Sequence, residues 1–200
     1  MFKFDKLVFG DLGWGDEFLF ATLMTITVSI LSMGLGLCLA IITVWAKLIT
    51  NRITRFIATF YTTVVRGVPE LLVIYLIFFG GNSVLMSVAK LFGYNGYIEL
   101  NALTIGTIAI AFISATYSSE VIRAAYLAVN KGQVEAAKAL GLSRIQIFLR
   151  VMGPQIIRHA LPGIGNVWQI TLKDTSLISV TGLVEIMRQT RIASNVEHSP

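Results

Sequence analysis

Long stretches without ionisable side chains are the feature that most constrains what this chain can fold into. Asp, Glu, Lys and Arg are all absent from Phe18 to Ala46, from Leu71 to Ala89 and from Leu100 to Ser119. A helix needs about 20 apolar residues to cross the hydrocarbon core of a bilayer. A buried helix of a soluble protein is usually shorter and keeps a polar face. Each of the three stretches therefore predicts a membrane-spanning helix.

A fourth span is predicted from His159 to Val184, with an interruption inside it. Lys173 and Asp174 are the charged residues in this otherwise uncharged segment. Charge inside a membrane is costly, so we expect a tilted or broken span. The composition agrees, since 55% of the residues are hydrophobic and 14% are charged, against about 25% charged in soluble domains. The predicted fold class is all-α, a polytopic membrane bundle with four visible spans.

Basic residues predict how the chain is oriented. The segment after the first span carries Lys47, Arg52 and Arg55 and no acid, and residues 120–158 carry six basic residues against two acids. Lys and Arg favour the cytoplasmic side of a membrane. We therefore expect an external N-terminal segment, 1–17, and a cytoplasmic loop at 131–154. The net charge of +5 is explained by topology, and nucleic-acid binding is not expected.

Small residues recur every fourth position in two of the spans. In a membrane they let helix backbones approach closely, so both stripes predict helix–helix interfaces. Whether they face this chain or a partner stays open at this stage. The stripes are Ser32, Gly36 and Ala40 in the first span, and Ala111, Ala115 and Ser119 in the third.

The loop 131–154 contains the signals of two short helices. Good helix formers run from Val134 to Leu140, and Gly141 stands where a left-handed residue ends a helix. Ser143 is suited to cap a second helix, which we expect Gly153 and Pro154 to interrupt. The apolar face of that helix, expected to pack on the membrane domain, is formed by Ile145, Phe148, Leu149 and Met152.

Two short helices around a glycine also describe a DNA-binding helix-turn-helix. The unit is tethered between two spans, however, which would hold a recognition helix against the bilayer. A docking knob for a soluble partner is the better interpretation.

The same loop carries a specific motif. Glu135-Ala136-Ala137 is followed after three residues by Gly141, and nine residues later by Val151, Met152, Gly153 and Pro154. This pattern resembles the EAA loop of the permease subunits of ABC importers. The family usually has Ile at Val151 and Leu at Gly153.

Further motifs narrow the resemblance to the polar amino acid permeases over about residues 18–190. An acid follows Pro69, as in the subgroup for histidine, basic amino acids and opines. The matching stretches are Arg66-Gly67-Val68-Pro69, Ser119-Glu120-Val121-Ile122-Arg123, Lys131-Gly132-Gln133 and Leu172-Lys173-Asp174-Thr175-Ser176-Leu177.

The resemblance implies a set of partners and a place in the cell. The expected partners are a dimer of ATP-binding subunits, a second homologous permease, a periplasmic substrate-binding protein and membrane lipid. The sequence has no G-x-x-x-x-G-K-[ST] loop, so ATP and Mg²⁺ are expected to be used by the partner and no cofactor by this chain. The expected location is the bacterial inner membrane, with a periplasmic N-terminus. The residues expected to couple to the ATPase are Glu135, Ala136, Ala137, Gly141, Leu142 and Ser143.

Charged residues inside the membrane are candidates for the substrate path. We expect Arg66 near mid-bilayer, where insertion scales assign about 2.5–3.5 kcal/mol to Arg. Glu70 is its i+4 neighbour and a candidate partner, and Pro69 between them predicts irregular backbone of the kind found at transporter sites. A purely structural ion pair is the alternative. The full set of path candidates is Arg66, Glu70, Lys173, Asp174, Thr175 and Ser176.

The predicted function is that of an importer permease without an ATPase, catalytic or metal site of its own. Two other classes stay open: an ion-coupled secondary transporter using the pairs Arg66/Glu70 and Lys173/Asp174, and a membrane sensor or scaffold. The resemblance also implies a fifth span. The residues after Val184 are too polar to supply one, so we expect a truncated chain with a polar tail at 191–200.

Overall fold

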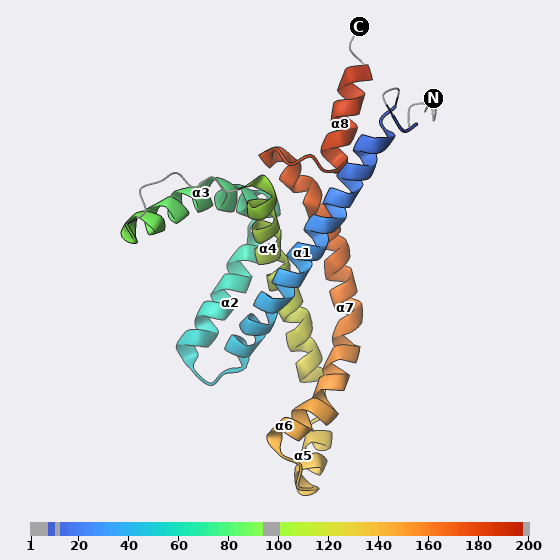
Figure 1. The fold of residues 1–200 in the computed structure, drawn as a ribbon. Coiled ribbons are helices and arrows are strands. Elements are labelled where there is room, and N and C mark those ends of the chain that lie inside the picture. The colour runs from blue at the N-terminus through green and yellow to red at the C-terminus, as the bar shows by residue number, and fades with distance from the viewer. Residues whose placement is uncertain (1–7, 11–12, 94–100, 198–200) are drawn as a thin grey trace.

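The computed structural model describes residues 8–10, 13–93 and 101–197, and its regular elements there are helices. The elements are α1 (Gly15–Leu48), α2 (Arg52–Gly67), α3 (Glu70–Leu91), α4 (Ala102–Ala128), α5 (Lys131–Ala139), α6 (Arg144–Ile147), a π-helical segment (Phe148–Met152), α7 (Gly153–Asp174), a 3₁₀ segment (Thr175–Thr181) and α8 (Ile186–Glu197) (Figure 1). The all-α prediction is confirmed. Most of the N-terminal segment predicted at 1–17 lies outside the described residues.

Two helices of the described part, α1 and α4, are long and apolar enough to cross a membrane. A third candidate is the pair formed by α2 and the first part of α3, which bends by 111° between Gly67 and Glu70. The bend follows from Pro69, because the residue before a proline is kept out of the helical region, and Val68 is extended at φ −102° and ψ 140°. The second uncharged stretch thus forms a helix, but one that belongs to a broken unit beginning at Arg52.

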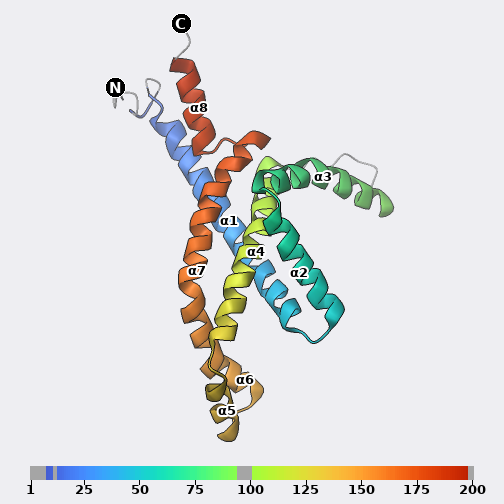
Figure 2. The ribbon, with the colours of Figure 1, turned by 180° about the vertical axis from the view of Figure 1, so that it is seen from behind.

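The first and third predicted spans pack directly on each other. Ser32 Oγ donates to the Thr107 carbonyl at 3.1 Å. A Cβ added at Gly36 would lie 2.2 Å from Ser114 Oγ, so only glycine allows this approach. Ala115 is fully buried in the same contact zone. The two small-residue stripes therefore form one interface inside this chain, and α1 crosses α4 in both ribbon views (Figures 1 and 2).

The 3₁₀ segment that follows α7 packs against α1 and α4. The helix stops at Asp174 and continues as the 3₁₀ segment, so the predicted break at Lys173 and Asp174 lies where the helix type changes. Ile178 of the 3₁₀ segment is fully buried and its side chain lies against Gly106. Of the described helices, α7 is not among those long and apolar enough by composition to cross a membrane.

The tail predicted to be a polar run is helical in α8 up to Glu197. Glu185 explains why this helix starts, because its carboxylate accepts from the backbone N–H groups of Met187 at 2.9 Å and Arg188 at 2.8 Å. These amides have no partner inside the helix. Glu185 is almost fully buried in this role, which the sequence pattern does not signal.

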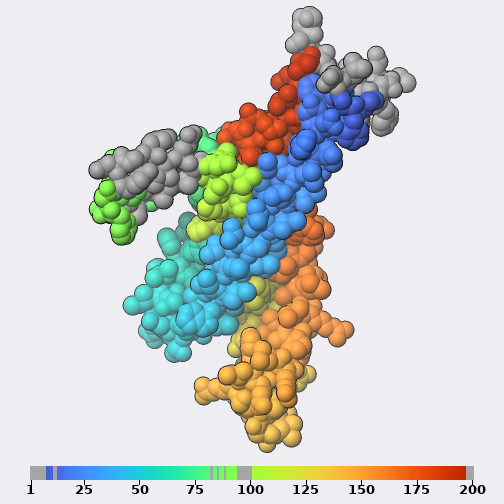
Figure 3. Space-filling view, viewed as in Figure 1, coloured from blue at the N-terminus to red at the C-terminus, as the bar shows by residue number. Residues whose placement is uncertain are grey.

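The outer faces of α1 and α2 carry many exposed large apolar side chains, among them Phe20, Ile41, Phe56 and Phe60. Figure 3 shows α1 running across the front of the molecule with its surface uncovered. Apolar patches of this extent are unusual on soluble monomers and are suited to a hydrocarbon environment.

Candidate functional site

Two of the predicted path residues, Arg66 and Glu70, contact Tyr117 in the middle of α4. The Tyr117 hydroxyl donates to Glu70 Oε1 at 3.1 Å. The guanidinium carbon of Arg66 lies 5.4 Å from the centre of the Tyr117 ring, within cation–π range. Asp174, at the end of α7, lies close enough to interact electrostatically with both Glu70 and Tyr117. Side chains from α2 and α3 therefore both contact this tyrosine of α4.

Sequence reasoning missed Tyr117. The residue belongs to an uncharged stretch in which only the stripe of small residues was singled out. The available signal was a phenol among aliphatic and small residues, because a buried Tyr hydroxyl usually finds a hydrogen-bond partner. Nothing local in the sequence indicates that this partner is Glu70.

Arg66 and Glu70 do not form the expected i+4 ion pair within the described residues. The pairing rule needs a continuous helix, and here α2 ends at Gly67 before α3 begins at Glu70 with a different direction. The expectation of irregular backbone at Pro69 is confirmed, but it is this irregularity that separates the two charges. Tyr117 contacts both of them instead.

The remaining path candidates lie at the end of α7. Asp174 is 8% exposed and Thr175 is buried, whereas Lys173 is exposed. The Thr175 hydroxyl donates to the Leu172 carbonyl and the Ser176 hydroxyl to the Lys173 carbonyl, each at 2.7 Å. The two hydroxyls thus use their protons to hold the helix end, and their lone pairs stay available as acceptors.

A cleft of about 420 Å³ opens between α2 and α4, next to Tyr117. Its volume lies in the range of small-molecule sites, about 300–1,000 Å³. Its wall is mainly polar, with three threonine hydroxyls, one guanidinium and one carboxylate. The lining residues are Thr59, Thr62, Thr63, Arg66, Gly67, Tyr117 and Glu120.

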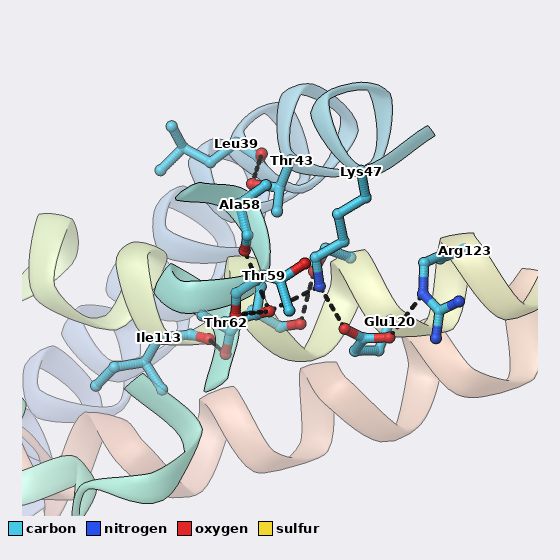
Figure 4. Close-up of polar contacts among 11 residues, drawn as sticks. Leu39, Thr43, Lys47, Ala58, Thr59, Thr62, Ile113, Glu120 and Arg123 are labelled. Carbon is cyan, nitrogen blue, oxygen red and sulfur yellow. Dashed lines mark hydrogen bonds and ion pairs between the residues drawn. The ribbon is translucent and has the colours of Figure 1, made fainter. Parts of the chain in front are cut away.

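A polar network reaches the cleft through Thr62 and Glu120. Lys47 of α1 forms an ion pair with Glu120 of α4 and donates to Thr62 Oγ1 of α2 at 2.7 Å. Glu120 also accepts from Arg123 at 3.0 Å, as expected for residues one turn apart. Figure 4 shows the Lys47 ammonium between α2 and α4, pointing at Thr62 and Glu120. The network ties three helices together.

We call residues 131–152, which comprise α5, α6 and the π-helical segment, the knob. Its helix boundaries largely follow the predicted local structure. Gly141 adopts a left-handed conformation with φ 76°. Ser143 caps α6 in a reciprocal capping box with Gln146. The first helix starts at Lys131, three residues earlier than predicted, because Asn130 caps it through a hydrogen bond from Gly132 N at 2.8 Å.

The second helix does not end at Gly153 and Pro154, as was expected. The chain passes through the π-helical segment Phe148–Met152 into α7, with Pro154 in the first turn of that helix, where a missing N–H costs little. A Cβ at Gly153 would lie 3.0 Å from the Phe148 carbonyl oxygen. A glycine avoids this close contact within the π-helical turn.

The apolar face of the knob does not pack on the membrane domain, which corrects a second expectation. Ile145 is 72% exposed, and Phe148 and Leu149 are also exposed. The knob projects beyond the other helices (Figures 1 and 2). Its own small core holds Ala137 and Ile147. Ala137 thus packs inside the knob, while Glu135, Ala136, Gly141 and Ser143 are exposed and Leu142 is half-buried.

Residues 33–198 match the model of a protein family described as binding-protein-dependent transport system inner membrane component. The chain belongs to this family. It is 50% identical over 195 residues to the nopaline transport system permease protein NocQ of Agrobacterium fabrum, covering 97% of this chain and 83% of that protein. It is 39% identical over 188 residues to the histidine/lysine/arginine/ornithine permease HisQ of Escherichia coli, covering 94% and 82%.

A solved structure shows the same arrangement of helices. The crystal structure of an amino acid ABC transporter with histidines superposes with a TM-score of 0.77 at 30% identity, covering 93% of this chain and 81% of that chain. The resemblance inferred from the EAA loop is thereby confirmed, and so is the bundle of an ABC permease. The permease is a transport subunit of the inner membrane, and the ATPase of such systems is carried by a separate subunit.

Proposed function

We propose that this permease forms the membrane path of an importer for cationic amino acids or opines. The observation that carries the proposal is the contact of both Arg66 and Glu70 with Tyr117, next to an open cleft. Charges at such a depth mark substrate and ion pathways in membrane proteins. The substrates named for the relatives, nopaline and histidine, lysine, arginine or ornithine, support the class. Lys173, Thr175 and Ser176 border the same path in this proposal.

The exposed knob is the docking site for the ATP-binding subunit in this proposal. Leu140 is 83% exposed and Ile145 is 72% exposed at its tip, which is the kind of apolar surface that a partner buries. Glu135, Ala136, Gly141 and Ser143 of the same knob are exposed as well, and Leu142 is half-buried. Two such ATP-binding subunits, a second homologous permease and a periplasmic substrate-binding protein complete the proposed transporter.

The proposed orientation has the knob in the cytoplasm and the N-terminus in the periplasm. The knob carries several basic residues, and Arg52 and Arg55 lie in the first turn of α2, next to its connection with α1. Both lie at the same end of the bundle (Figure 1). Positive charge at this end supports its cytoplasmic location.

Reconstitution of the complete transporter tests the proposal. We expect proteoliposomes containing the permease, its partner permease and the ATP-binding subunits to take up radiolabelled L-arginine or nopaline when binding protein is outside and ATP is inside. Omitting ATP or the ATP-binding subunit is expected to abolish uptake. Uptake by the permease alone, driven by an ion gradient, would instead support the secondary-transport alternative. Failure to take up either substrate with all components present would overturn the proposed substrate class.

A further inference from the structure

The Lys131-Gly132-Gln133 motif lies where the chain enters the knob from α4. The Gln133 side chain reaches from this point to the exit of the knob, because its Oε1 atom accepts a hydrogen bond from Gln155 Nε2 of α7 at 2.6 Å. The two residues are 22 positions apart in the sequence. This bond therefore joins the first turn of α5 to the first turn of α7.

The glycine of the motif serves the cap of α5. Asn130 Oδ1 accepts from the backbone N–H of Gly132 at 2.8 Å, and α5 starts there. A Cβ added at Gly132 would lie 3.2 Å from Asn130 Oδ1, so a glycine leaves room for this cap. The cap holds the start of α5 in place, and Gln133 projects from it toward α7.

The Gln155 side chain also contacts the π-helical segment. Its Nε2 atom donates to the Val151 carbonyl at 2.7 Å, in addition to Gln133 Oε1. A side-chain amide has two N–H donors, and both are used here. Because a carbonyl can only accept, the Gln155 nitrogen and not its oxygen must face Val151, which fixes the direction of the bond to Gln133 as well. Gln155 thus links α5, the π-helical segment and α7.

The π-helical segment is a joint between the knob and α7. The Gly153 N–H donates to the Phe148 carbonyl, five residues earlier. Pro154 has no N–H, and a proline ring crowds the carbonyl four residues before it, so a wider turn relieves this clash. Helices bend at such π-helical turns, which are frequent at functional sites. The chain is therefore expected to bend here unless another contact braces it.

The apolar face of the knob does not fix its orientation on the bundle. Ile145 is 72% exposed and Leu149 is 64% exposed, and the knob projects beyond the other helices (Figures 1 and 2). The buried Ala137 and Ile147 lie inside the knob. The angle between the knob and α7 thus depends on the π-helical joint and on the bond that braces it.

We propose that Gln133 and Gln155 form a brace that sets the angle between the knob and α7 and so couples the ATP-binding subunit to the membrane helices. With the brace in place, a displacement of the knob moves α7, whereas without it the displacement bends the joint. The 3₁₀ segment after α7 packs through Ile178 against Val28 of α1 and Ile110 of α4, so a movement of α7 reaches the bundle. This inference rests on the proposed function, because it needs the ATP-binding subunit to dock on the knob. Both glutamines act as positioning residues.

Substitution of Gln155 with Leu tests the brace, because Leu has a similar size and cannot donate to Gln133 or Val151. The complete transporter is reconstituted in proteoliposomes with binding protein outside and ATP inside, and arginine uptake and ATP hydrolysis are measured in the same sample. We expect the arginine transported per ATP hydrolysed to fall about fivefold, the factor that corresponds to about 1 kcal/mol for one lost hydrogen bond. The ATP-binding subunit should co-purify as with the native permease. His159→Leu, exposed one turn further along α7, is the matched control and should keep the native ratio.

Two double variants separate a brace from a general need for glutamine. Gln133→Glu with Gln155→Lys replaces the amide bond with an ion pair, and the ammonium can also donate to the Val151 carbonyl. We expect this variant to recover at least half of the native ratio of arginine transported to ATP hydrolysed. Gln133→Glu with Gln155→Glu places two carboxylates together, which repel each other, so its ratio should be no higher than that of Gln155→Leu.

The distance between two spin labels measures the angle at the joint directly. The labels are attached at Lys138→Cys in α5 and Leu161→Cys in α7, both exposed positions, after Cys38→Ser has removed the native thiol. We expect double electron–electron resonance on the complete transporter to give a narrow distance distribution with the native brace and with His159→Leu. Gln155→Leu should give a broader one.

Three results would overturn the inference. They are a native ratio of transport to hydrolysis in Gln155→Leu, equal ratios in the two double variants, and a distance distribution that Gln155→Leu leaves unchanged. Each of these can occur while the native transporter shows ATP-driven uptake. Failure of the proposed function would instead appear in the native transporter, so the two failures are distinguishable.

Discussion

Lys47 of α1 forms an ion pair with Glu120 of α4, and the Lys47 side chain is only 7% exposed. The same ammonium donates to Thr62 of α2, so one buried cation connects the helices on both sides of the cleft and α1 as well. The position of the cleft wall therefore depends on this contact.

Replacing Lys47 with Met is expected to destabilise the permease. Breaking a buried ion pair costs about 3–5 kcal/mol when the remaining charge has no partner. Glu120 keeps Arg123 and is 26% exposed, so we expect the low end of this range. The measurement is the thermal unfolding of the detergent-solubilised protein, with Arg52→Met as control. The double variant Lys47→Met, Glu120→Leu should recover part of the loss. If it unfolds at a lower temperature than Lys47→Met, the lost stability has another origin.

The α1–α4 contact predicts different outcomes for two glycines on one helix. A Cβ at Gly36 would lie 2.2 Å from Ser114 Oγ and 3.1 Å from the Ala111 carbonyl oxygen, whereas a Cβ at Gly34 would meet nothing within 4 Å. Overpacking typically costs about 1–3 kcal/mol. We therefore expect Gly36→Ala to lower the unfolding temperature, and Gly34→Ala to leave it unchanged or raise it. Equal effects of the two substitutions would contradict the close approach seen here.

Local signals in the sequence were enough to predict the elements that local interactions form. The uncharged stretches indicated where α1 and α4 lie, and Gly141 and Ser143 marked the two helix boundaries of the knob. Each signal acts within one or two helical turns. The break at Lys173 and Asp174 was predictable for the same reason.

Interactions between distant residues could not be predicted in this way. The expected pair of Arg66 and Glu70 was wrong because Pro69 changes the chain direction, and their common partner Tyr117 is far away in sequence. The start of α8 was missed because its capping residue is Glu185. The residues that usually indicate a helix start are Ser, Thr, Asp and Asn. The exposed face of the knob was missed because an apolar stripe predicts burial but does not indicate whether the covering surface belongs to this chain or to a partner.

The left-handed conformation of Gly141 predicts an ordered series of variants. A Cβ there would meet nothing within 4 Å, so backbone strain is the whole cost at φ 76°. That cost is about 1–2 kcal/mol for most residues and lower for Asn. We expect ATP-driven uptake to decrease in the order Gly141→Asn, Gly141→Ala, Gly141→Val, with permease levels in the membrane unchanged. Equal uptake in all three would mean that the shape of the knob does not matter for coupling.

The exposed tip of the knob predicts a loss of docking without a loss of folding. Leu140 is 83% exposed, so Leu140→Glu removes no packing inside the permease, but it would place a charge in the apolar contact proposed for the ATP-binding subunit. We expect the variant to unfold at the native temperature and to recover at least tenfold less ATP-binding subunit in co-purification. Leu140→Met is the matched control and should co-purify normally, because it keeps the apolar surface. Full recovery of the ATP-binding subunit with Leu140→Glu would exclude the tip of the knob as the docking site.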